Sequence, residues 1–131
     1  MEKFRKTLVI IGGVNFLLFG LLHIAFWFDP VIDWKNELVK LTQLNSNIMQ
    51  MLNIAIIAFF LAFGFIMLYY RREFLDSTLG RVLLIVFALF WLVRLVAEIV
   101  FPEGTIILGV ILFLAMLIYL IPAIITKKQN E

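Results

Sequence analysis

Residues 105–126 read TIILGVILFLAMLIYLIPAIIT, a run of twenty-two residues without a charged side chain. An α-helix rises about 1.5 Å per residue, so a helix of this length spans the roughly 30 Å hydrocarbon core of a bilayer. Residues 7–28, 48–70 and 79–101 form three further apolar runs of similar length. The sequence therefore predicts an all-α integral membrane protein with four transmembrane helices.

The composition of the whole chain supports a membrane location. The chain has 131 residues, of which 64% are hydrophobic and only 15% are charged. A soluble domain is usually about half apolar and about a quarter charged. A small water-soluble fold could not bury this much apolar surface, so the lipid bilayer is the expected solvent. The length predicts a single membrane domain covering residues 1–131.

The distribution of Lys and Arg predicts the orientation of the helices. Eight basic residues lie on the side that carries both termini: Lys3, Arg5, Lys6, Arg71, Arg72, Arg81, Lys127 and Lys128. Only Lys35 and Lys40 lie on the opposite side. Basic residues concentrate in cytoplasmic loops, so we expect an up-down-up-down bundle with both termini in the cytoplasm. A bacterial inner membrane fits this pattern best.

The connection between the first two spans is predicted to contain an amphipathic interfacial helix over residues 30–45. Asp29 is a suitable N-cap, Pro30 suits the first helical position, and Asp33 places a negative charge in the first turn. Trp34 would lie at the level of the lipid head groups. Residues 101–104, Phe-Pro-Glu-Gly, predict a tight outer turn, which would make the last two spans an antiparallel hairpin.

Polar residues inside the spans mark the candidate site, because charged groups within a membrane are costly and are usually functional. Counted at about 1.5 Å per residue, all of them except Asn15, which lies near the midplane, fall in one layer about 3 to 11 Å inside the outer edge of the core. Arg94 and Glu98 also share a helix face with Trp91, because residues four apart lie one above the other. We therefore predict an outer polar pocket covered by residues 29–47. Its candidate ligand-binding residues are His23, Trp34, Gln50, Asn53, Trp91, Arg94 and Glu98.

Two functions remain open. In the first, the pocket binds a lipid, a quinone or another small amphiphile, with Arg94 pairing with its anionic group and His23 and Asn53 orienting it. In the second, the chain is a structural or accessory subunit that packs against a second copy or a partner membrane protein. Arg94 and Glu98 would then neutralise each other, and the other polar residues would join neighbouring helices. Small residues for close helix packing occur at Ala55, Ala58 and Ala62.

Other classes of function have weaker support. A single histidine and no cysteine exclude a zinc site with the usual set of ligands, and no phosphate-binding Gly-rich loop occurs, so we predict no cofactor. Catalysis by His23 as acid or base is conceivable but rests on no specific motif. The inner half of the spans is almost wholly apolar, which disfavours a transport path. The basic residues lie in short loops and tails, where they orient helices rather than bind nucleic acid.

Overall fold

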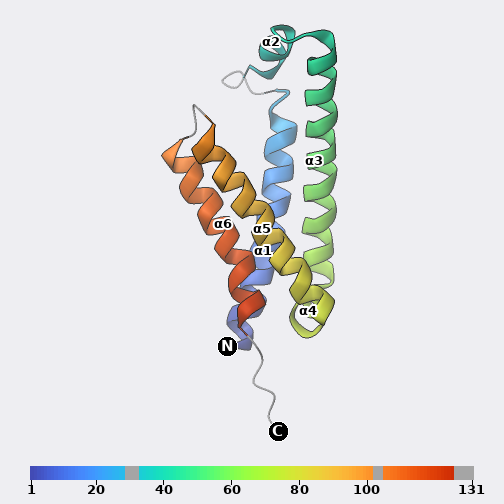
Figure 1. The fold of residues 1–131 in the computed structure, drawn as a ribbon. Helices are drawn as coiled ribbons and strands as arrows, with labels where there is room; N and C mark the ends of the chain where they lie inside the picture. Colours follow the sequence, from blue (N-terminus) through green and yellow to red (C-terminus); the bar gives the residue numbers. More distant parts are fainter. Residues whose placement is uncertain (29–32, 102–104, 126–131) are drawn as a thin grey trace. The chain divides into compact units, whose positions relative to one another are not determined.

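The computed structural model describes residues 1–28, 33–101 and 105–125, which form helices and no strand. The helices are α1 (Glu2–Ala25), α2 (Trp34–Val39), α3 (Gln43–Tyr69), α4 (Arg71–Asp76), α5 (Thr78–Val100) and α6 (Ile106–Ile124) (Figure 1). Four of them, α1, α3, α5 and α6, are long and apolar enough to cross a membrane. The predictions of an all-helical chain and of four helices long and apolar enough to cross a membrane are therefore confirmed.

The helices extend beyond some of the apolar runs that predicted them. α1 begins at Glu2 rather than at residue 7, and α3 begins at Gln43 rather than at residue 48. Backbone hydrogen bonding continues through polar residues, whereas hydropathy marks only the part of a helix that suits lipid. Thr42 supplies a start signal for α3, because its hydroxyl accepts a 3.3 Å hydrogen bond from the backbone N–H of Asn45.

The segment predicted as one interfacial helix over residues 30–45 is interrupted in the structure. Its helix, α2, covers only Trp34–Val39, and residues 40–42 form a turn and a bend before α3 begins. Asp33 precedes α2 with a positive φ of 49°, and its carboxylate accepts hydrogen bonds from the side chain of Asn36 at 2.9 and 2.8 Å. The predicted capping residues Asp29 and Pro30 lie outside the described residues, as do Pro102, Glu103 and Gly104 of the predicted turn.

The chain divides into two compact units, each of which is described by itself. Residues 1–13 and 66–131 form the first, called here the α5–α6 unit. Residues 14–65 form the second, called here the α1–α3 unit. The single membrane domain expected from chain length stays a prediction.

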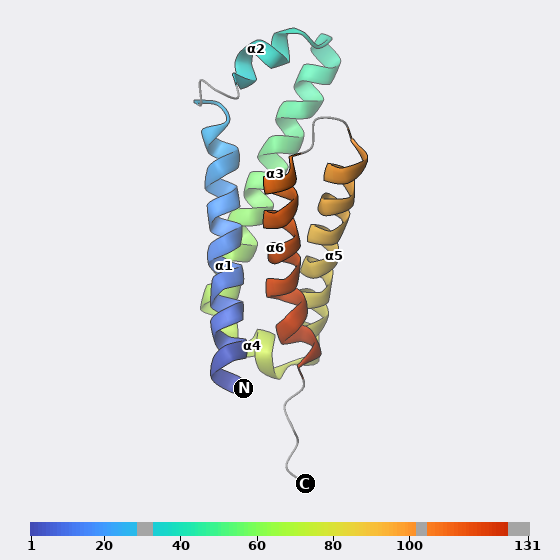
Figure 2. The ribbon, with the colours of Figure 1, turned by 90° about the vertical axis from the view of Figure 1, so that its left-hand side faces the viewer.

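The α5–α6 unit is built on two helices that lie side by side and run in opposite directions (Figures 1 and 2). Tyr119 of α6 packs between aromatic residues of α5: its ring centroid lies 5.8 Å from that of Phe87 and 6.4 Å from that of Trp91. All three side chains are at most 1% exposed. Burial of large aromatic rings contributes much of the stability of such a core.

The short helix α4 is held tightly against the start of α5. A Cβ atom added to Gly80 would lie 2.2 Å from the carbonyl oxygen of Glu73 and 2.4 Å from Cα of Phe74, so only glycine fits there. The Ser77 hydroxyl connects α4 to α5: it donates to the Glu73 carbonyl at 2.7 Å and accepts from the Gly80 N–H at 2.9 Å. Ser77 thus acts as the N-cap of α5.

The α1–α3 unit joins the second half of α1 to most of α3 through aromatic packing. The ring of Phe16 lies 5.8 Å from that of Phe59 and 5.6 Å from that of Phe60. One turn further along α1, Gly20 permits close approach: an added Cβ would lie 2.8 Å from Cδ2 of Leu61. Small residues of this kind let membrane helices pack closely.

Candidate functional site: a groove between α5 and α6

The seven predicted site residues are distributed over both compact units. His23, Trp34, Gln50 and Asn53 belong to the α1–α3 unit. Trp91, Arg94 and Glu98 belong to the α5–α6 unit. A single pocket formed by all seven stays a prediction.

His23 and Asn53 form a reciprocal pair in the α1–α3 unit. His23 Nδ1 lies 2.7 Å from Asn53 Oδ1, and Asn53 Nδ2 donates to the backbone carbonyl of His23 at 3.2 Å. Asn53 is only 4% exposed. Gln50 lies one turn before Asn53 on α3 and is half-buried. The pair joins α1 to α3, as expected of polar residues that connect helices in a membrane.

The two tryptophans of the predicted site have different surroundings. Trp34 packs against Phe26, with 6.0 Å between the ring centroids. Its indole Nε1 is buried and has no hydrogen-bond partner among the residues that the structure describes. Trp91 is 1% exposed and contacts Phe90 and Tyr119, so it belongs to the core of the α5–α6 unit.

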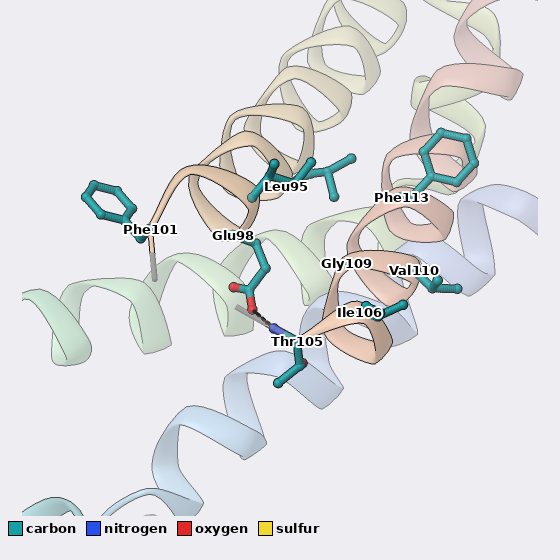
Figure 3. Close-up of a pocket in the computed structure, with 9 residues that line it drawn as sticks. Leu95, Glu98, Phe101, Thr105, Ile106, Gly109, Val110 and Phe113 are labelled. Carbon is teal, nitrogen blue, oxygen red and sulfur yellow. Dashed lines mark hydrogen bonds between the residues drawn. The ribbon is translucent and has the colours of Figure 1, made fainter. Parts of the chain in front are cut away.

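Arg94 and Glu98 form an ion pair that also reaches α6. Arg94 Nη1 donates to Glu98 Oε2 at 2.8 Å. Glu98 Oε1 accepts from the backbone N–H of Thr105 at 3.0 Å (Figure 3). The Glu98 side chain is 10% exposed and that of Arg94 is 46% exposed. A carboxylate beside the first residues of a helix is stabilised by the helix dipole, so Glu98 helps to hold the start of α6 against α5.

An apolar groove opens beside Glu98, and Arg94 is not among its described lining residues. Its volume is about 560 Å³, within the range of roughly 300–1,000 Å³ typical of small-molecule sites. Its lining comes from both helices and the residues at their ends: Leu95, Glu98, Ile99, Phe101, Thr105, Ile106, Gly109, Val110 and Phe113 (Figure 3). Among the described lining residues, only Glu98 and Thr105 are polar, and the others form an apolar wall.

Gly109 contributes to the open shape of the groove. An added Cβ at this position would meet only Cδ1 of Leu95, at 3.9 Å, which is ordinary van der Waals contact. Gly109 and its apolar neighbours were not among the predicted site residues, because polarity inside the spans was the signal for the site. In the structure Gly109 faces Leu95, one turn from Glu98, which depends on how α5 and α6 pack and is not marked in the sequence.

Comparison with known protein families, curated proteins and solved structures finds no match. The function must therefore be inferred from the geometry of the described residues.

Proposed function

We propose that this integral membrane protein binds an acidic amphiphile, such as a fatty acid or an acidic lipid, in the groove between α5 and α6. The observation that carries the proposal is an apolar groove whose lining includes Glu98, the ion-pair partner of Arg94. A hydrocarbon chain would lie along Leu95, Ile99 and Val110, where apolar contact needs no hydrogen-bonding partner.

Arg94 is the group that would recognise the acidic head. Its Nη1 is engaged by Glu98, but a guanidinium has five N–H donors in a planar fork. The 46% exposure of its side chain leaves it accessible. A carboxylate or phosphate would therefore bind Arg94 by charge-assisted hydrogen bonds, with Glu98 keeping the guanidinium in place. A neutral quinone would gain less from this arrangement.

The proposal includes a topology. We place the four spans up-down-up-down in a bacterial inner membrane, with both termini in the cytoplasm and α2 at the outer membrane surface. The support is the eight-to-two distribution of Lys and Arg along the chain. In this orientation the groove opens into the outer leaflet, where membrane amphiphiles reach it from the side.

Native mass spectrometry of detergent-purified protein with added oleate tests the proposal. Gly109→Leu adds bulk to the groove without changing charge, and Gly109→Ala is its matched control. We expect Gly109→Leu to weaken oleate binding by about tenfold or more, which corresponds to a loss of roughly 1.4 kcal/mol of binding free energy. Gly109→Ala should bind oleate with wild-type affinity. Arg94→Leu should remove the preference for oleate over oleyl alcohol. Wild-type affinity for oleate in Gly109→Leu would refute the proposed site.

The alternative function is that of an accessory subunit acting through helix packing. One observation favours it: Ala55, Ala58 and Ala62 are exposed along α3. Small residues at this spacing allow another helix to approach closely. The double variant Ala58→Leu with Ala62→Leu would then abolish a dimer or a larger assembly seen by native mass spectrometry. The same variant should leave oleate binding unchanged.

A further inference from the structure

A second pocket lies at the opposite end of the α5–α6 unit from the groove. Its volume is about 300 Å³, and its lining comes from α1 and α4: Glu2, Lys6, Arg71, Arg72, Leu75 and Asp76. The start of α1 and α4 lie at the same end of this unit (Figures 1 and 2). Thr78 at the start of α5 is twenty residues from Glu98, so the two pockets are about 30 Å apart along this helix.

The pocket carries more basic than acidic side chains among the described residues. Arg71 donates through Nη1 to the Leu68 carbonyl at 3.1 Å. Lys6 and Arg72 make no hydrogen bond and no ion pair within the part of the chain that the structure describes. Three basic and two acidic side chains line the pocket, so its net charge is 3 − 2 = +1. This charge suits a monoanion.

The pocket lies next to the ends of helices that are long enough to cross a membrane, where the membrane interface is expected. α4 follows the membrane-crossing helix α3 directly and leads directly into the membrane-crossing helix α5. Tyr69 and Tyr70 lie just before α4 and are 68% and 50% exposed. Tyrosines concentrate at the boundary between lipid and water. Lys6, Arg71 and Arg72 would therefore lie at the depth of the lipid head groups.

The buried residue Arg5 holds the walls of this pocket together. Arg5 is 4% exposed; its Nη2 donates to the Leu75 carbonyl at 3.1 Å and its Nε donates to the Pro122 carbonyl at 3.4 Å. Leu75 itself lines the pocket. Arg5 thus joins the start of α1 to the ends of α4 and α6, which holds together the backbone segments that carry Lys6 and Arg72 before any ligand arrives. Such preorganisation lowers the entropic cost of binding.

We infer that this pocket binds the phosphodiester head group of an anionic membrane phospholipid. Lys6, Arg71 and Arg72 would contact the phosphate oxygens, as basic pockets at helix ends do with acidic lipids. Glu2 and Asp76 would accept hydrogen bonds from head-group hydroxyls. The same two carboxylates would repel a dianion, so a lipid phosphodiester suits the pocket better than free phosphate does.

The test is a native mass spectrometry titration with phosphatidylglycerol, carried out in Gly109→Leu protein so that the groove between α5 and α6 does not contribute. The test variant is Lys6→Gln with Arg72→Gln. The control is Lys35→Gln with Lys40→Gln, which changes the net charge equally at two residues of the α1–α3 unit. We expect the test variant to bind phosphatidylglycerol about tenfold more weakly and the control to bind it unchanged.

Two further arms identify the source of the phosphate. Phosphatidylcholine should bind more weakly than phosphatidylglycerol, because its head group carries no net charge. Millimolar inorganic phosphate should not displace bound phosphatidylglycerol. Equal loss in the test and control variants, or wild-type affinity in the test variant, would overturn the site. Displacement by inorganic phosphate would overturn the lipid assignment.

Discussion

The hydroxyl of Tyr119 on α6 donates a 2.7 Å hydrogen bond to the backbone carbonyl oxygen of Gly12 on α1. Tyr119 is fully buried. A Cβ added to Gly12 would lie 2.9 Å from Cε1 of Tyr119 and 3.1 Å from Cε of Met67, so the absent side chain makes room for the ring. This contact joins α1 to α6, within one compact unit, through one small and one large residue.

Removal of this hydroxyl should weaken the fold. Tyr119→Phe retains the ring and loses only the hydrogen bond, so we expect the free energy of unfolding to fall by about 1 kcal/mol. Gly12→Ala should cost more, about 1–3 kcal/mol, because the added methyl group displaces the ring. Unfolding in sodium dodecyl sulfate followed by circular dichroism measures both. A Tyr119→Phe variant as stable as wild type would show that the hydrogen bond adds nothing.

Gly80→Ala should be the most damaging of the glycine substitutions. The added methyl group would meet backbone atoms of Glu73 and Phe74 within 2.4 Å, and backbone cannot rotate away as a side chain can. We expect a loss of about 3 kcal/mol or more, comparable to a severe core defect, and a lower thermal unfolding temperature. Gly109→Ala is the control, because its methyl group meets only Leu95 at 3.9 Å. The control should be neutral or stabilising by up to about 1 kcal/mol through helix propensity.

Replacement of Arg5 should separate the effect of charge from that of geometry. Arg5→Met leaves the carbonyls of Leu75 and Pro122 without these donors, at an expected cost of about 1–3 kcal/mol. Arg5→Lys keeps the charge, but one ammonium group does not reproduce a planar guanidinium that reaches two helix ends. We therefore expect Arg5→Lys to recover less than half of the lost thermal stability. Full recovery would mean that charge alone stabilises this end of the unit.

A double-mutant cycle should reveal the coupling between His23 and Asn53. The variants are His23→Phe, Asn53→Leu and their combination, with the free energy of unfolding measured in detergent. We expect a coupling of about 1 kcal/mol, since interhelical polar pairs in membranes average about 0.6 and reach about 1.7 kcal/mol. A second cycle, with Gln50→Leu in place of Asn53→Leu, is the control and should show smaller coupling. Equal coupling in the two cycles would argue against a specific His23–Asn53 interaction.

The candidate site could be predicted from the sequence only in part. The spacing of Arg94 and Glu98 by four residues on a helix predicts their ion pair, which the structure contains. The contact of Glu98 with the Thr105 backbone depends on the path of the chain between α5 and α6, which spacing does not specify. The groove was missed because Leu95, Ile99 and Val110 are indistinguishable in sequence from residues that face lipid.

The sequence by itself determined the solvent and the helices of this protein. Four long apolar runs require lipid around them. In lipid, the backbone N–H and C=O groups of each run must form hydrogen bonds within the run itself, which an α-helix achieves. Only the tertiary structure decided that the Arg5 side chain is buried, rather than exposed as a charge in a loop. It also decided that Gly12 faces Tyr119. Arg5 and Pro122 are 117 residues apart, and Gly12 and Tyr119 are 107 apart. Hydropathy and periodicity are local properties, whereas these contacts depend on which distant helix faces pack together.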